Sequence, residues 1–400
     1  MNRLSGLIRA SETRRWAVAA LTVFALFSAL LFVSHVTYDT NDDCTIVSIT
    51  AGYMTGEPDP ATVFTSYGYG FVLSTLYRLC ATLPWHALLL LLFNALAQTA
   101  LLMGCLTLCT DTGIRLRYGF LLFGSLWLGV LMRYSVQLQF SATAGVLFAA
   151  GTLLYTLPVA GVGRRARLVR RWVAAAFFLF CFALRPNVAL MLAPYAVIPA
   201  VMEVWRKSPA RRATAVFTLC LLLGYGLLTG LDALLYHTQA GWSTFTDYDA
   251  QLTTLLDYSA NTLPAKNYEA ALASAGWSAN LGHMIRNWYF LDSRIDTGTL
   301  AALNAAIASQ LPALPLPERL LHILYATGSL VRRYPMFQFT MVSFGLIVVV
   351  VALGFLRRHM PLSSLRALLP LMYAVLLIAY FYGVLGRFPL RIAFAVACPA

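Results

Sequence analysis

Three aspartates stand close together directly after the first long apolar stretch of the chain. The segment reads Tyr38-Asp39-Thr40-Asn41-Asp42-Asp43. A carboxylate beside apolar helices loses hydration, and a second carboxylate nearby repels it, so such a group becomes a stronger base. Two chemistries fit this pattern: proton abstraction from a hydroxyl group, or coordination of Mg²⁺ or Mn²⁺ by carboxylate oxygens. We therefore predict Asp39, Asp42 and Asp43 as catalytic residues, with Asp42 and Asp43 as candidate metal ligands.

The alternative for this segment is structural. Asn41 and Asp42 are residue types that cap helices, and a helix over residues 44–53 would need such a cap. Three acids within five residues exceed what capping requires. We therefore favour the functional interpretation.

Arginines at the predicted outer ends of apolar stretches are the second signal. Basic residues are disfavoured on that side of a membrane, and a guanidinium binds phosphate through two parallel hydrogen bonds. The alternative for each one is that it reaches water alone or pairs with a loop acid. The six are Arg133, Arg185, Arg332, Arg333, Arg387 and Arg391. From these we predict four ligands of a lipid phosphate: Arg387, Arg391, Arg185 and Arg333.

A third set lies in a long polar segment. Asp257 and Tyr258 combine a carboxylate with an aromatic ring, and Trp288 follows later in the same segment. Carbohydrate sites often use this combination, so we predict these three as substrate-binding residues. Ordinary folded loops contain such residues too, and Trp277, Trp288 and Tyr289 also suit anchors at a membrane interface.

The elements that must position these residues are membrane helices. The chain has 400 residues, of which 60% are hydrophobic and 11% charged, whereas soluble domains carry roughly 25% charged residues. Its apolar runs are continuous and long enough for helices that cross ~30 Å of hydrocarbon, unlike the short alternating segments of a β-barrel. The fold class predicted is all-α, a polytopic transmembrane bundle of about nine to ten spans.

The predicted spans follow from these runs. They cover residues 15–36, 84–109, 117–136, 139–160, 172–185, 187–205, 213–236, 336–356 and 367–385. A tenth begins near residue 391, and the chain stops within it, which suggests a partial sequence. We treat residues 1–400 as one membrane domain with two outer segments. Segment 37–83 contains a short amphipathic helix over 66–80, and segment 237–335 is a folded helical insertion, with one helix beginning after Ser278 and another capped by Asp296 or Thr297.

Charge supports this topology. The predicted cytoplasmic segments hold 18 basic and three acidic residues, and the outer side holds 11 basic and 13 acidic residues. Cytoplasmic loops of membrane proteins carry such an excess of lysine and arginine. The net charge of +13 therefore needs no nucleic-acid partner. We expect a multi-pass protein of the plasma membrane with a cytoplasmic N-terminus.

Several motifs resemble those of the GT-C superfamily of membrane glycosyltransferases, within an uncharacterised bacterial branch of polytopic proteins. They are Asn41-Asp42-Asp43, Gly52-Tyr53-Met54-Thr55-Gly56-Glu57-Pro58-Asp59, Leu76-Tyr77, Pro84-Trp85, Leu256-Asp257-Tyr258, Gly276-Trp277-Ser278, Asn287-Trp288-Tyr289 and Gly386-Arg387-Phe388-Pro389-Leu390-Arg391. The resemblance implies a polyprenyl-phosphate sugar as donor, an envelope glycan, lipid or protein as acceptor, and reaction on the outer face. It also implies that Asp42 or Asp43 serves as the base or as a metal ligand.

Two other functions fit the same residues. A transporter or flippase for a lipid-linked saccharide would bind with these arginines and acids without breaking a bond. A non-catalytic subunit of an envelope-assembly pathway would need no acidic cluster. Transporters are often built from two related halves with interrupted spans, and no such symmetry is visible here.

Overall fold

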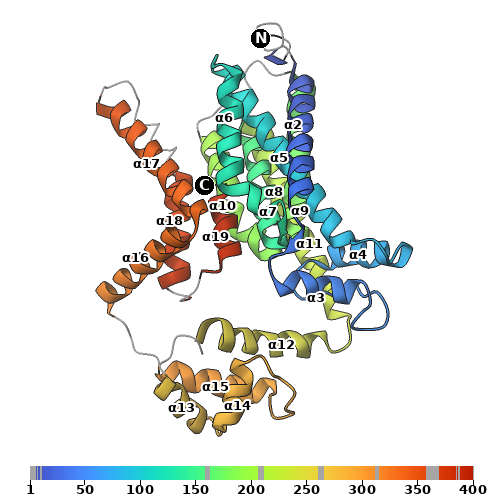
Figure 1. Ribbon diagram of the computed structural model, residues 1–400, viewed down its shortest axis with the longest axis vertical. Coiled ribbons are helices and arrows are strands. Elements are labelled where there is room, and N and C mark those ends of the chain that lie inside the picture. Colours follow the sequence, from blue (N-terminus) through green and yellow to red (C-terminus); the bar gives the residue numbers. More distant parts are fainter. Residues whose placement is uncertain are drawn as a thin grey trace. The chain divides into compact units, whose positions relative to one another are not determined.

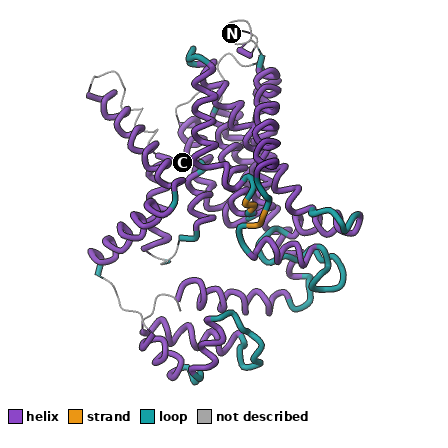
Figure 2. Tube along the Cα trace, in the orientation of Figure 1, coloured by secondary structure: helices purple, strands orange, loops and turns teal. Residues whose placement is uncertain are grey.

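The computed structural model describes residues 6, 8–9, 11–157, 163–205, 211–259, 265–310, 315–356, 369–383, 385 and 388–399. Within these residues the chain is helical apart from one pair of two-residue strands (Figure 2). It divides into two compact units instead of the single predicted domain. Unit 1 is Met1–Asp232, Val331–Val375 and Leu390–Ala400, and unit 2 is Ala233–Leu330 and Leu376–Pro389. Unit 2 thus covers most of the predicted outer segment 237–335.

Unit 1 contains the following helices over their full length. They are α2 (Glu12–Val33), α3 (Asn41–Thr50), α4 (Tyr67–Leu79), α5 (Trp85–Asp111), α6 (Leu116–Leu126), α7 (Met132–Tyr134), α8 (Phe140–Thr156), α9 (Arg164–Leu184), α10 (Pro186–Trp205), α17 (Pro335–Leu356) and α19 (Leu390–Ala397). A π-helical turn, η1 (Trp127–Leu131), joins α6 to α7. Three further helices cross the boundary between the units: α11 (Arg211–His237), α16 (Leu316–Arg333) and α18 (Leu369–Gly383).

Apolar helices of spanning length are present, as predicted. In the described part of the chain, α2, α5, α10 and α11 are long and apolar enough to cross a membrane, and α8 and α18 are shorter apolar helices. The apolar segment 66–80 forms α4, which has 13 residues. That length reaches only about 20 Å, too short for a bilayer. These helices support the prediction of a helical membrane protein.

Helix α8 lies at the centre of unit 1, where α5, α9, α10 and α19 pack against it. The helices α2, α5, α8 and α9 run alongside one another in Figure 1. Small residues permit the close approach: a Cβ added at Gly145 of α8 would lie 2.6 Å from the Cα of Ala395 in α19. This packing holds α19, and with it Arg391, against the core.

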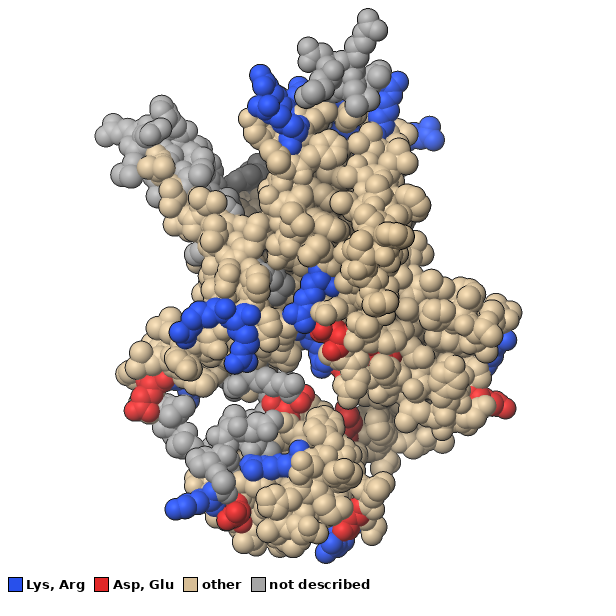
Figure 3. All heavy atoms as spheres, in the orientation of Figure 1, with Lys and Arg blue, Asp and Glu red and all other residues tan. Residues whose placement is uncertain are grey.

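One end of unit 1 is tied together by basic residues. Arg170 of α9 donates to Glu12 of α2 at 2.7 and 3.0 Å, and Arg171 donates to Thr214 at the start of α11. Figure 3 shows basic side chains gathered where α2 and α6 begin. These contacts place the starts of α2, α9 and α11 at one end, so the predicted acidic turn after α2 belongs to the opposite end.

Two short strands fix the acidic turn. β1 (Thr37–Tyr38) follows α2 and pairs in parallel with β2 (Gln137–Leu138), which lies between α7 and α8. The Thr37 N–H donates to Val136 O at 3.0 Å, and the Asp39 N–H donates to Leu138 O at 2.9 Å. The turn is therefore attached by its backbone beside the start of α8.

Unit 2 contains a small helical cluster. Its elements are α12 (Trp242–Thr253), η2 (Thr254–Ser259), α13 (Ala265–Ser274), α14 (Ala279–Arg286) and α15 (Thr297–Gln310). Its core is built from twelve buried residues: Leu255, Leu256, Tyr268, Ala271, Leu272, Trp277, Leu281, Ile285, Ile295, Leu300, Leu303 and Ile307. The predicted folded insertion is thus a helical body with its own core.

Local predictions in unit 2 succeed in part. Ser278 caps α14, because its Oγ accepts from the Leu281 N–H, and Asp296 caps α15 by accepting from the Thr299 N–H at 2.7 Å. The helix that begins after Ser278 ends at Arg286, and Trp288 has a left-handed backbone with φ 63°. Trp277 was expected at a membrane interface, but it is only 7% exposed because it packs in the core.

Candidate functional site at the acidic turn

The three predicted aspartates each meet a different partner element. Asp39 pairs with Arg133 of α7 at 3.1 Å, and Asp42 pairs with Arg391 of α19 at 2.8 Å. Asp43 contacts His86 at the start of α5 at 3.0 Å. Helix α3 begins at Asn41 instead of residue 44, and successive helical residues point about 100° apart. Asp42 and Asp43, which are successive residues of this helix, therefore point in different directions, and Asp39 precedes the helix.

Asp43 is fully buried and accepts three hydrogen bonds. Its Oδ1 accepts from His86 Nε2 at 3.0 Å and from the backbone N–H of Phe140 at 3.1 Å, and its Oδ2 accepts from Thr40 Oγ1 at 3.2 Å. Phe140 is the first residue of α8, so the carboxylate lies at the positive end of that helix dipole. The geometry gives Asp43 a positioning role, because it joins α3, α5 and α8.

His86 connects Asp43 to Tyr69 of α4. The Tyr69 hydroxyl lies 2.9 Å from His86 Nδ1, and both side chains are buried. Burial, reinforced by the negative charge of Asp43, raises the pKa of Tyr69 well above its usual value. The phenol therefore keeps its proton and donates to Nδ1, which leaves the proton of Nε2 to be donated to Asp43.

The two acid–arginine pairs are more accessible than the buried pair of Asp43 and His86. The side chains of Asp39 and Asp42 are 16% and 15% exposed, and those of Arg133 and Arg391 are 43% and 23% exposed. Partly solvated ion pairs exchange partners at lower cost than buried ones, because less desolvation must be repaid. An anionic ligand can therefore compete for these two guanidinium groups.

Arg185 belongs to the same neighbourhood. It follows the end of α9, donates from Nη1 to Phe64 O at 3.1 Å, and lies over the rings of Phe64 and Phe140 at 5.0 and 5.3 Å. The backbone of Phe140 is the donor to Asp43. The structure thus brings Arg185, Arg391 and the three aspartates to one end of unit 1.

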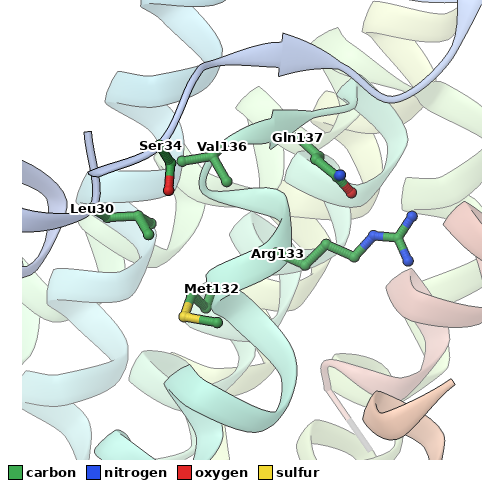
Figure 4. A pocket seen from close by; sticks show the side chains of 6 residues that line it. All are labelled: Leu30, Ser34, Met132, Arg133, Val136 and Gln137. Carbon is green, nitrogen blue, oxygen red and sulfur yellow. The ribbon is translucent and has the colours of Figure 1, made fainter. Parts of the chain in front are cut away.

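A cleft opens beside the Asp39–Arg133 pair. It has a volume of about 440 Å³ and is lined by Leu30, Ser34, Met132, Arg133, Val136 and Gln137. Figure 4 shows the Arg133 side chain extending away from Leu30 and Met132, so the cleft has an apolar part and a cationic part. This arrangement suits an amphiphile whose apolar chain lies in the apolar part and whose anionic head group lies in the cationic part.

The remaining predicted site residues lie elsewhere. Arg387 lies outside the described residues. Arg333 is exposed at the end of α16. In unit 2, Asp257 lies in η2 and Trp288 in the exposed turn after α14, whereas the side chain of Tyr258 lies outside the described part. Their assignment to substrate binding stays a prediction.

The predicted divalent cation does not fit the observed donor set. Asp43 faces an imidazole N–H, a backbone N–H and a hydroxyl group, and Asp42 faces a guanidinium. Mg²⁺ and Mn²⁺ need several converging oxygen ligands. Within the described residues, no three histidine, cysteine or acidic side chains form such a group. We therefore derive no step through a metal.

Sequence reasoning missed His86 and Tyr69 as partners of Asp43. A usable signal was present, because His86 stands at the start of a predicted span, where an ionisable residue is costly unless paired. Its partner could not be inferred, since 43 residues separate it from Asp43.

Comparisons with protein-family models, curated proteins and solved structures find no match to this chain. Fold and site together define an all-helical protein in which, among the described residues, four helices are long and apolar enough to cross a membrane and two acid–arginine pairs lie at one end of unit 1.

Proposed function

We propose that this protein is a membrane glycosyltransferase that moves a sugar from a polyprenyl-phosphate donor to an acceptor in the cell envelope. The observation that carries the proposal is the ion pair between Asp42 and Arg391. It joins a candidate general base to a candidate phosphate ligand at the end of a membrane bundle. Arg133 with Asp39 repeats the arrangement.

The proposed reaction begins with exchange of partners. The phosphate of the donor binds the Arg391 guanidinium, which suits phosphate geometry, and releases the Asp42 carboxylate. Asp42 then accepts the proton of the acceptor hydroxyl while that oxygen attacks the anomeric carbon. The bond from this carbon to the phosphate oxygen breaks, and polyprenyl phosphate leaves with its added charge beside Arg391. Stabilising that charge is commonly the larger catalytic contribution.

An apolar cavity in unit 1 supports a lipid-linked donor. It has a volume of about 420 Å³ between α8, α9, α10 and α11, with lining residues that include Leu190 and Thr229. Leu190 lies about one turn after the start of α10, and Thr229 lies about one turn before Asp232. A chain filling the cavity would therefore end near the layer of Arg185.

The proposed topology follows the charge distribution. About nine to ten spans, a cytoplasmic N-terminus and an outward-facing acidic turn would place the reaction on the outer face of the plasma membrane. The basic end of unit 1, where Arg170 meets Glu12, would then face the cytoplasm.

The decisive experiment measures release of polyprenyl phosphate from a panel of synthetic polyprenyl-phosphate sugars, with an envelope extract as the acceptor source. We expect Asp42→Asn to lower the rate by about 10²–10⁴-fold, as for loss of a general base. Arg391→Gln should lower it by about 10²–10³-fold, as for loss of a charge-stabilising donor. Asp111→Asn and Arg117→Gln change the same residue types at the opposite end and should retain activity.

Two outcomes would defeat the proposal. Full activity in both site variants would remove the assigned base and phosphate ligand. Movement of the intact lipid-linked sugar between leaflets, without cleavage, would establish the transporter function instead.

A further inference from the structure

Helix α16 (Leu316–Arg333) carries an apolar stripe that is exposed in the part of the chain that the structure describes. Leu316, Leu320 and Leu324 recur every four residues on one side of the helix, with Leu321 and Tyr325 beside them. Each of these five side chains is between 51% and 72% exposed. Contiguous apolar surface of this kind marks an interaction site.

The opposite side of the helix is polar and basic. At 100° per residue, Glu318, His322, Ser329 and Arg333 fall on one face, and Arg319 borders it. Arg319 and Arg333 are both exposed. An apolar stripe opposite an arginine-containing polar face is the pattern of a helix lying in a membrane interface.

The position of α16 in the chain points to the same surroundings. Only Tyr334 separates it from α17, a helix of 22 residues without a charged side chain. Pro335 begins α17, as proline often begins a new helix. Within unit 2, Ile323 of α16 packs on Gly383 of the apolar helix α18. Apolar helices therefore adjoin α16 both along the chain and by packing.

We infer that α16 lies along the membrane surface, with its leucine stripe among lipid chains and its arginines at the level of lipid phosphates. A bilayer is the occupant that satisfies both faces, because it offers hydrocarbon and anionic headgroups at adjacent depths. This inference places the last part of the predicted outer segment 237–335 at the membrane surface. It does not depend on the proposed enzymatic function.

The test uses the full-length protein in nanodiscs of mixed phosphatidylcholine and phosphatidylglycerol. The photoreactive residue p-benzoylphenylalanine replaces Leu321 or Tyr325 on the stripe, or His322 or Ser329 on the polar face as matched controls. Mass spectrometry then identifies the adducts. We expect lipid adducts from positions 321 and 325 in several-fold excess over positions 322 and 329. Two stripe positions guard against a variant that fails to fold.

A second readout tests the arginines. We expect the preference for phosphatidylglycerol among adducts at position 321 to fall by about fivefold for each of Arg319→Gln and Arg333→Gln, and to be unchanged by Arg117→Gln at the start of α6. Protein cross-links from positions 321 and 325, or equal lipid labelling on both faces of the helix, would overturn the inference.

Discussion

Two neighbouring aspartates differ in role because their surroundings differ. Asp43 is enclosed and accepts from His86, Thr40 and the start of α8. Asp42 is partly solvated and faces Arg391. A fully satisfied buried carboxylate contributes to structure, whereas an accessible one paired with a partly exposed cation is available for chemistry.

At residue scale, we expect Asp43→Asn to destabilise the protein by about 1–3 kcal/mol, because the amide leaves buried donors without an acceptor. Asp42→Asn should cost less than about 1 kcal/mol, since partly exposed ion pairs contribute little. Thermal unfolding in detergent, followed by tryptophan fluorescence, compares the two variants. Equal destabilisation would contradict the division of roles.

The acids could be predicted from the sequence, but their partners could not. Three aspartates beside an apolar stretch stand out by composition alone. Their contacts with His86, Arg133 and Arg391 span up to 349 positions along the chain, and only packing determines which distant groups meet. The different directions of the Asp42 and Asp43 side chains depend on α3 starting at Asn41, and the divalent cation stays a prediction.

Among the elements, α19 is short but carries a site residue. It is held against α8 where Gly145 meets Ala395, and the Tyr195 hydroxyl donates to Val396 O at 3.3 Å. The absence of a side chain at Gly145 therefore helps to set the position of Arg391.

We expect Gly145→Ala to push α19 away from α8, at a cost of about 1–3 kcal/mol for overpacking, and to weaken the Asp42–Arg391 pair. Gly124 lies in helix α6, and a Cβ there would meet nothing within 4 Å. Gly124→Ala should therefore be neutral or stabilising by up to about 1 kcal/mol. Melting temperatures of both variants check this, and a lower value for Gly124→Ala alone would refute it.

The exact ends of the helices are predicted less well than their positions along the chain. The predicted span 187–205 closely matches α10, but the predicted span 172–185 begins eight residues after the true start of α9 at Arg164. Arginine is a good helix former, so the helix continues through the basic segment. The predicted span begins only at residue 172 because hydropathy reports apolar side chains, and the arginines before it are helical without being apolar.

For the whole molecule, the two ends of unit 1 carry different charged contacts, and both ends contain arginine–carboxylate pairs. Basic residues tie the starts of α2, α9 and α11 together, and the acidic turn follows the other end of α2. Sequence charge predicts a basic cytoplasmic side and an acidic outer side, and this sidedness stays a prediction. Sequence charge could not predict the division into two units, which depends on the separate core of unit 2.

Thiol labelling in intact cells tests the proposed sidedness. Cys44 on α3 is exposed, and hydrogen bonding with Thr82 lowers the pKa of the nearby Cys80 thiol, which favours reaction. We expect a membrane-impermeant maleimide to label both cysteines from outside. A Thr112→Cys variant at the end of α5 should react only after permeabilisation, and the reverse pattern would invert the topology.

The strand pair β1–β2 has an evolutionary consequence. It attaches the acidic turn through main-chain groups alone, at Thr37 and Asp39. The exposed positions 37 and 137 can therefore change in sequence while the turn keeps its place, whereas Leu138 is fully buried and Tyr38 lies beside the ring of His86. Proline is the exception at positions 37 and 39, since it would delete the donor itself. The backbone of the acidic turn can thus be inherited unchanged while the exposed side chains on its two strands vary.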